Sequence, residues 1–192
     1  MRKRTVAMIA GTVGVAGVAA WLLSTSRAFT KQVPYEVLEH DGRFEIRSYD
    51  AVPVVVAQMN GEQGDDAFRK LFRFIAGGNS RQQKLSMTSP VFIDRTPGHA
   101  TMSFALPANA AQNPPVPADA VVRLDRRPAA RMAVVRFSGG THRNSESEAE
   151  EQLRAWLRGR NLVPNGEAVV AYYDAPFIPG FLRRNEVMLP VK

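Results

Sequence analysis

The stretch DDAFRKLFRFIAGG, residues 65–78, decides the fold of this chain. Its apolar residues recur at the spacing of one helix face, at Phe68, Leu71, Phe72 and Ile75. This spacing predicts a helix over 65–76, and the glycine pair that follows is typical of a helix end. Residues 145–160 predict a second helix, with four acidic residues near its start and three arginines near its end.

Short apolar, β-branched runs flank both predicted helices. Asp41-Gly42, between two alternating runs, predicts a hairpin. Further strands are expected at 52–59, 84–93, 101–106, 121–125, 131–137, 167–174 and 186–191, and a proline-rich connector at 107–118. The order strand-strand-helix-strand-strand thus occurs twice. It predicts an α+β fold in which a duplicated β-β-α-β-β unit forms a distorted antiparallel β-barrel flanked by two helices.

An N-terminal hydrophobic helix is expected before this domain. Residues 6–23 are an uncharged run that follows three basic residues, and a helix of that length spans roughly 27 Å, enough to cross a bilayer core. We therefore expect 1–31 to be a membrane anchor or signal segment with a short linker, and 32–192 to be the folded domain. The positive-inside rule places that domain in the periplasm of a bacterium, anchored to the inner membrane, or released if the leader is cleaved.

The net charge of +7 does not point to nucleic acid. Residues 1–31 carry five basic and no acidic side chains, so the remaining chain is nearly balanced. A nucleic-acid binder needs its positive excess on the folded surface, and we expect no nucleic acid as a partner. The chain has no cysteine, which excludes disulfides, cysteine-ligated metals and covalent haem attachment through cysteine.

No familiar catalytic motif occurs, whether of zinc peptidases, α/β-hydrolases, dinucleotide-binding enzymes or P-loop enzymes. The histidines His40, His99 and His142 stand beside turn signals and share no metal-ligand spacing. The apolar loop 176–182 is followed at once by Arg183 and Arg184. This pattern suits a flat apolar ligand with carboxylate tails, or a loop that covers the core beside a structural arginine–glutamate network. The residues alone leave both alternatives open.

Four ordered blocks resemble the SOUL haem-binding protein family. They are YEV and FEIRSY within 35–49, FRKLFRFIAGGN at 68–79, KLSMTSPV at 84–91, and YDAPFIPGFLRRNEV at 173–187. The resemblance covers about residues 34–191. It implies a distorted barrel related to the GyrI-like small-molecule binders. It also implies non-covalent binding of a tetrapyrrole, either haem b or another porphyrin.

The resemblance further implies a pocket between the first helix and the loop before the last strand. Its cofactor-binding residues would be Phe68, Leu71, Phe72, Ile75, Phe177, Phe181, Arg183 and Arg184. The two loop arginines, together with Arg69 and Arg73, are candidate partners of the propionates. No axial iron ligand is assigned, because no histidine lies in a matched block and Met87 is expected in the core.

The expected function is a non-catalytic haem carrier, buffer or sensor, with no catalytic residue assigned. One alternative is a GyrI-like hydrolase of small molecules, for which Glu186, Tyr172 and Tyr173 are the nearest candidate residues. Another is an interaction module on the same barrel. The oligomeric state is left open.

Overall fold

The computed structural model describes residues 30–60, 64–96, 98–140, 143–175 and 178–192. The helices are α2 (Asp65–Ile75), α3 (Ala108–Ala111), α4 (Arg143–Gly159) and the 3-10 turn η1 (Gly180–Leu182). The strands are β1 (Lys31–Gln32), β2 (Glu36–Asp41), β3 (Phe44–Tyr49), β4 (Val52–Gln58), β5 (Thr88–Ser89), β6 (Val91–Asp94), β7 (Thr101–Ala105), β8 (Val122–Arg127), β9 (Ala130–Phe137), β10 (Val169–Tyr172) and β11 (Asn185–Pro190).

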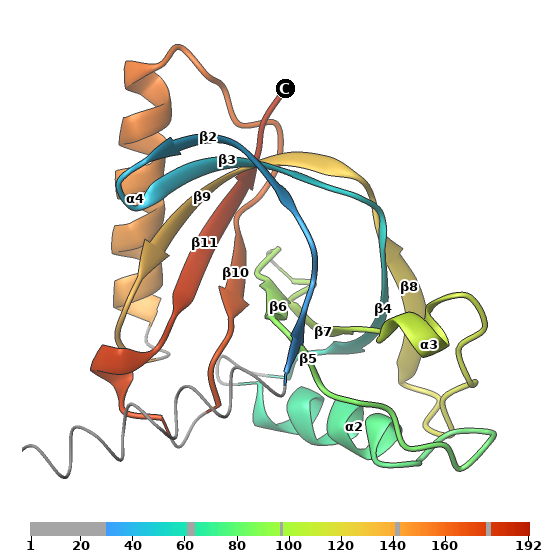
Figure 1. Ribbon diagram of the computed structural model, residues 1–192. Coiled ribbons are helices and arrows are strands. Elements are labelled where there is room, and N and C mark those ends of the chain that lie inside the picture. Colours follow the sequence, from blue (N-terminus) through green and yellow to red (C-terminus); the bar gives the residue numbers. More distant parts are fainter. Residues whose placement is uncertain (1–29, 61–63, 97, 141–142, 176–177) are drawn as a thin grey trace, which may run out of the picture.

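Nine of these strands form one antiparallel sheet in the order β2-β3-β9-β11-β10-β6-β7-β4-β8. The sheet curls into a half-barrel whose edges are β2 and β8, with α4 along one half and α2 along the other (Figure 1). The short β1 and β5 pair in parallel beside it. This α+β architecture with two flanking helices confirms the fold expected from the sequence.

The two halves of the sheet exchange their first strands. In chain order the first unit is β3-β4-α2-β6-β7 and the second is β8-β9-α4-β10-β11. However, β3 pairs with β9 of the second unit, and β8 pairs with β4 of the first. The antiparallel pair β10–β6 joins the halves at the middle. The predicted duplication is therefore present, but each unit lends one strand to the other.

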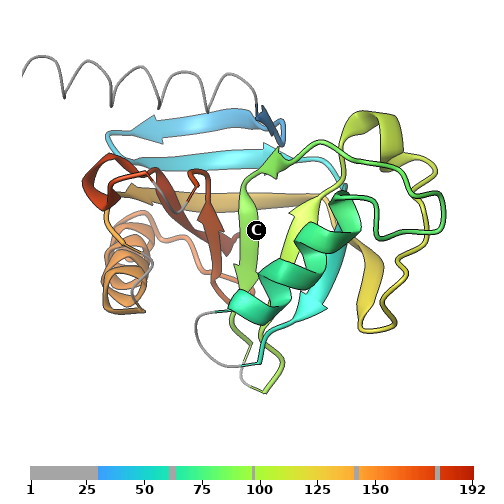
Figure 2. The same cartoon turned by 90° about the horizontal axis from the view of Figure 1, so that it is seen from below.

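Both helices cover the same face of the sheet. Val170 lies in the core beneath α2 and Val187 in the core beneath α4, and these two residues are directly paired on β10 and β11. Directly paired residues point to the same side of a sheet. Figure 2 shows the two helices well apart, with β10 and β6 between them.

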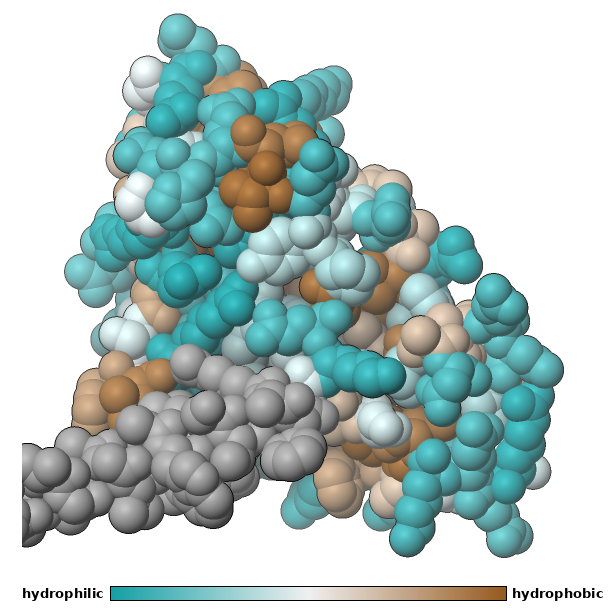
Figure 3. All heavy atoms as spheres, in the orientation of Figure 1, coloured by the Kyte–Doolittle hydropathy of each residue, from teal (hydrophilic) through white to brown (hydrophobic). Residues whose placement is uncertain are grey.

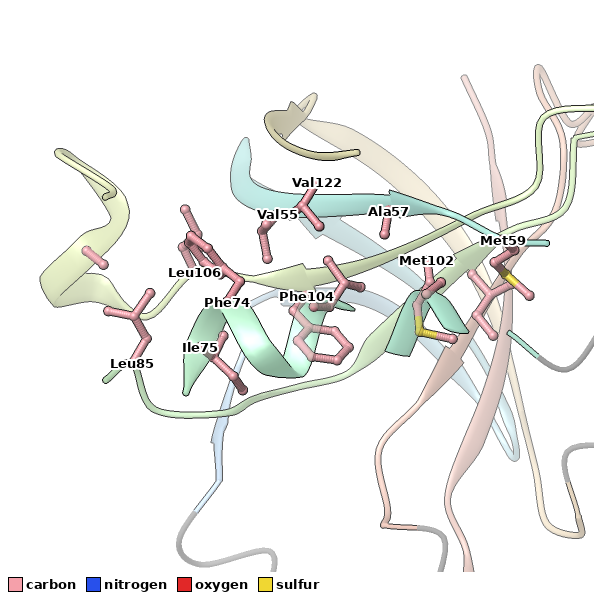
Figure 4. Packing of buried hydrophobic residues seen from close by; sticks show 14 of the residues in the cluster. Val55, Ala57, Met59, Phe74, Ile75, Leu85, Met102, Phe104, Leu106 and Val122 are labelled. Atoms are coloured by element: carbon pink, nitrogen blue, oxygen red, sulfur yellow. The ribbon is translucent and has the colours of Figure 1, made fainter. Parts of the chain in front are cut away.

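The buried side of α2 differs from the predicted stripe. Figure 4 shows Phe74 beside Leu106, on the side of α2 that faces the sheet, and Ile75 belongs to the same buried cluster, whereas Phe72 is 53% exposed. The stripe expected at Phe68, Leu71, Phe72 and Ile75 is therefore wrong at Phe72. Both this set and the observed one satisfy helical spacing, and contact with the sheet decides between them. The buried residues are Ala67, Leu71, Phe74 and Ile75.

Two other segments differ from expectation. Residues 84–87 form no strand, because Leu85 is buried against the end of α2 and donates its backbone N–H to the Ile75 carbonyl at 2.8 Å. Pro90, which lacks an N–H, then separates β5 from β6. The connector 107–118 contains α3, whose Ala110 is buried. It is therefore partly a core element.

The opposite face of the sheet, here called the open face, carries its own apolar cluster. Its residues include Tyr49, Phe92, Met132, Val169 and Met188. The segment that includes β1 borders this face, with Val33 buried in the same cluster. The described helices include none that is long and apolar enough to cross a membrane. The predicted leader helix, 6–23, lies outside the described residues.

Candidate functional site

The outer side of α2 presents an aromatic pair. The rings of Phe68 and Phe72 are stacked, with centroids 6.2 Å apart and planes 13° apart. Phe68 is half-buried and meets the Phe104 ring edge-on at 5.4 Å, which anchors it to the core. Phe72 is 53% exposed. The pair is therefore an apolar surface held from beneath.

Two arginines lie beside this aromatic pair. Arg69 and Arg73 each follow one of the phenylalanines by a single residue, and their four-residue spacing places them one turn apart on the helix. Their side chains are 74% and 71% exposed. Each contacts a carboxylate only at 4.0 Å, Asp66 and Asp119 respectively. Both guanidinium groups can therefore turn toward an anionic ligand at little cost.

The other two predicted residues of α2 lie in the core. Leu71 is fully buried and Ile75 is 6% exposed, so both fix the helix on the sheet. Met87 packs against the same core, as expected.

The loop before β11 is only partly described. Phe181, on η1, is 76% exposed, whereas Phe177 lies outside the described residues. Ile178 is buried, and its carbonyl accepts a hydrogen bond from Arg183 Nε at 2.6 Å. The helix α2 packs on β4 and β7, and two strands, β10 and β6, separate that half from β11.

Arg184 is engaged in a network on the open face. Its Nε donates to Glu186 Oε1 at 2.9 Å, and its Nη2 donates to the Tyr35 hydroxyl at 3.1 Å. The guanidinium also lies 3.8 Å from the centroid of the Tyr173 ring. Glu186 is paired with Ala171 of the open-face cluster, so this network lies on the side of the sheet away from α2. The structure does not bring Arg184 together with the aromatic pair.

Glu186 is the centre of that network and is completely buried. Arg47 donates to both of its carboxylate oxygens, at 2.7 and 3.0 Å, and the Tyr173 hydroxyl donates to it at 2.9 Å. Burial by itself would raise the pKa of Glu186, but the hydrogen bonds and charges of Arg47 and Arg184 outweigh it and hold the pKa below its usual value. Glu186 is therefore a buried carboxylate whose charge is balanced.

Arg47 was missed by the sequence reasoning. It is 1% exposed and also donates to Glu45 Oε2 at 2.6 Å and to the Tyr49 hydroxyl at 3.1 Å. The available signal was strand alternation in FEIRSY, which places Arg47 on the same side as the buried Tyr49. An arginine at a core position of a strand indicates a buried acidic partner.

The residues proposed for a hydrolase are held in networks of this kind. Tyr173 and Glu186 bind each other, and burial raises the pKa of Tyr173 well above its usual value. Tyr172 donates to Glu146, which also accepts two hydrogen bonds from Arg95. Burial and the bond to Glu146 raise the pKa of Tyr172. A carboxylate and phenols with such partners are poorly suited to accept a proton from a substrate.

No group of three or more metal-ligating side chains occurs within the described ranges. His40 is exposed and lies 3.9 Å from Glu45, and His142 falls outside those ranges.

Comparison with known proteins gives consistent results. A family model, SOUL heme-binding protein, matches residues 30–190. Heme-binding protein 1 of Xenopus laevis is 26% identical over 161 residues, covering 78% of this chain and 84% of the relative. Heme-binding protein 2 of Mus musculus is 28% identical over 170 residues, covering 82% of each.

Two solved structures share the fold. The EcmrR C-terminal domain matches with a TM-score of 0.56 at 14% identity, covering 82% of this chain and 98% of that domain. A hydrolase from Listeria innocua matches with a TM-score of 0.57 at 10% identity, covering 81% and 94%. At such identities the likeness extends to the fold alone.

Proposed function

Because this chain belongs to the SOUL heme-binding protein family, we propose that it binds haem or another tetrapyrrole non-covalently. Haem b is the proposed physiological form. The proposed role is that of a carrier, buffer or sensor and not that of an enzyme. The relatives Heme-binding protein 1 and Heme-binding protein 2 support the ligand class.

The observation that carries the proposal is the stacked pair Phe68–Phe72 on α2, in which Phe72 is exposed. A porphyrin is a flat apolar ring, and it can lie against such a surface with favourable stacking and burial of apolar area. The neighbouring Arg69 and Arg73 can pair with its propionates, since arginine binds carboxylates through two parallel hydrogen bonds. The geometry thus favours these two arginines over Arg184, whose Nε and Nη2 already donate to Glu186 and to the Tyr35 hydroxyl.

The residues on the outer side of α2 fit the porphyrin ring and its propionates, but they do not identify a ligand for the iron. The aromatic pair and the two arginines match the apolar ring and the carboxylates. We assign no axial residue, and haem that is bound here would be held through its ring and propionates. This mode suits a protein that takes up and releases its ligand.

We further propose that the leader holds the domain at the inner membrane, facing the periplasm, through residues 6–23. The support is the sequence alone: an uncharged run after three basic residues.

The test is a titration of the purified full chain with haemin, followed by Soret absorbance. We expect saturation at one haemin per chain. Phe72→Ala should weaken binding about tenfold, because loss of an aromatic contact and its buried area costs roughly 1–2 kcal/mol. Its thermal midpoint should stay close to that of the parent, since Phe72 is exposed.

The matched control is Leu38→Ala on the edge strand β2. Leu38 is 45% exposed, and Figure 3 shows a hydrophobic patch over that strand. Haemin adheres to apolar surfaces in general, so this control separates a specific site from adhesion. Equal losses for the two variants, or no defined stoichiometry, would reject the proposal.

A further inference from the structure

A cavity lies at the half of the sheet opposite α2. It is bounded by the start of α4, the end of β9 and the residues that precede β11, and its volume is about 590 Å³. Among the described residues that line it are four arginines, Arg43, Arg136, Arg183 and Arg184, and one carboxylate, Glu148. Arg184 is paired with Glu186, whose carboxylate lies behind the wall, so the positive charge that faces the cavity comes mainly from the other three arginines.

Arg136 is the arginine with the most capacity for a ligand. Its nearest carboxylate oxygens are 3.8 Å away on Glu186 and 4.0 Å away on Glu45, both beyond hydrogen-bond distance. Glu186 already accepts bonds from Arg47, Arg184 and Tyr173. Within the described part of the chain no acceptor is hydrogen-bonded to the Arg136 guanidinium, and its side chain is half exposed. It can therefore bind an added anion without breaking a hydrogen bond, at the expense only of these two longer ionic contacts.

Two further features of the wall favour negative charge. Arg43 donates a 2.6 Å hydrogen bond from Nη2 to Gln152 Oε1, which places its guanidinium at the wall. Ser145 belongs to the first turn of α4, a helix of 17 residues, and also lines the cavity. The positive end of the helix dipole adds to the field of the arginines.

We infer that this cavity binds a small molecule carrying phosphate groups. Guanidinium groups recognise phosphate through paired hydrogen bonds, and a cavity of this size suits a molecule of metabolite dimensions. Phe137 and Leu182 give the wall a small apolar area for the organic part of such a ligand. The site is separate from the aromatic face of α2, because it lies on α4 and β9.

The test uses pyrophosphate as the probe, titrated into the haem-free full chain by calorimetry at low salt. Arg136→Gln should weaken binding roughly tenfold, as expected for the loss of a charged hydrogen-bond donor. Arg158→Gln, an equal change of charge in the last turn of α4, should have almost no effect. Glu148→Gln should strengthen binding about twofold, because it removes the one carboxylate of the wall. A gain in affinity cannot result from loss of folded protein.

Three outcomes would overturn the inference. Equal effects of Arg136→Gln and Arg158→Gln would show that pyrophosphate responds only to net charge. Unchanged or weaker binding by Glu148→Gln would show that the probe binds elsewhere. Competition between pyrophosphate and haemin would make the cavity part of the haem site. Phe72→Ala should leave pyrophosphate binding unchanged, so the failure of one proposal does not imply the failure of the other.

Discussion

Arg47 and Glu186, which are 139 residues apart in the chain, form a two-point ion pair with distances of 2.7 and 3.0 Å. They lie on β3 and β11, which are separated by β9, so the pair bridges over a whole strand. Both side chains are excluded from water. Because β3 belongs to the first unit and β11 to the second, this contact ties the two halves of the fold together.

Removal of one partner of this pair should be severely destabilising. Glu186→Gln removes the fully buried counter-charge that Arg47 and Arg184 share and leaves Glu45 as the carboxylate beside Arg47. We expect a loss of about 3–5 kcal/mol in the free energy of unfolding. Urea denaturation measures it. Glu151→Gln, an equal charge change on α4, is the control and should alter stability by less than about 0.5 kcal/mol. A small loss for Glu186→Gln would mean that water reaches the cluster.

Stability should fall on acidification because of the same carboxylate. The pKa of Glu186 in the folded chain lies below its ordinary value of 4.5, so the unfolded chain binds the proton more readily. Its contribution is fully present above pH 4.5 and is lost as the pH falls through the lower folded pKa. Unfolding free energies measured between pH 7 and pH 3 should therefore decline more gently in Glu186→Gln than in the parent. Parallel curves would contradict this assignment.

The two pairs of candidate arginines should respond differently to a porphyrin whose carboxylates are esterified. Arg73→Gln should weaken haemin binding roughly tenfold and leave ester binding unchanged, because the ester offers no charge to the guanidinium. Arg184→Gln should lower the thermal midpoint and weaken both ligands alike, because Arg184 stabilises Glu186. Affinities and melting curves for both variants measure this. If Arg184→Gln weakened the binding of haemin but not that of the ester, the propionates would instead lie near the loop before β11.

Trp156 should contribute less to stability than a core tryptophan. It is only partly buried, its ring stacks on Phe44 at 5.2 Å, and its Nε1 donates to Asp41 at 2.8 Å. We expect Trp156→Ala to cost less than the roughly 3–5 kcal/mol typical of fully buried tryptophan. Haemin affinity per folded molecule should not change, because α4 lies on the other half from α2. A folded variant that fails to bind would identify α4 as the ligand helix.

The export prediction can be checked with a reporter that is active only outside the cytoplasm. Fused to the C-terminus of the full chain, it should give signal, and deletion of residues 1–24 should abolish it. Mass analysis of the membrane fraction then distinguishes an anchor, which keeps the full length, from a cleaved leader. Signal from the truncated chain would refute export.

Periodicity was enough to predict the helices and the duplication, because both depend on local spacing. The helices expected at 65–76 and 145–160 are observed as Asp65–Ile75 and Arg143–Gly159. The exchange of β3 and β8 was beyond reach, since strand partners are chosen by contacts between distant segments. The exposure of Phe72 could not be predicted either. Two faces of the helix are almost equally apolar in sequence, and contact with the distant sheet decides which of them is buried.

The candidate site was predictable as a region and not as a set of contacts. The family blocks directed attention to α2 and to the loop before β11. They could not show that Arg184 is paired with Glu186. The other members of this network are Arg47, which binds Glu186, and Tyr35, which binds Arg184, and both come from the other end of the chain. The arginine-lined cavity could not be predicted either, because its residues are far apart in the sequence. Its wall combines Arg43, Arg136 and Arg183, three positions that no sequence window contains.

The exchange of first strands makes the middle of the chain the poorest place to divide it. A cut within 107–118 would leave β3 without β9 and β4 without β8, while β6 and β10 would lose each other. Neither fragment would have a complete sheet, and each would expose edges that only the other can satisfy. Each half of the chain is therefore an incomplete sheet that needs the other half to complete it. The connector acts as a tether that keeps each half at a high effective concentration for the other.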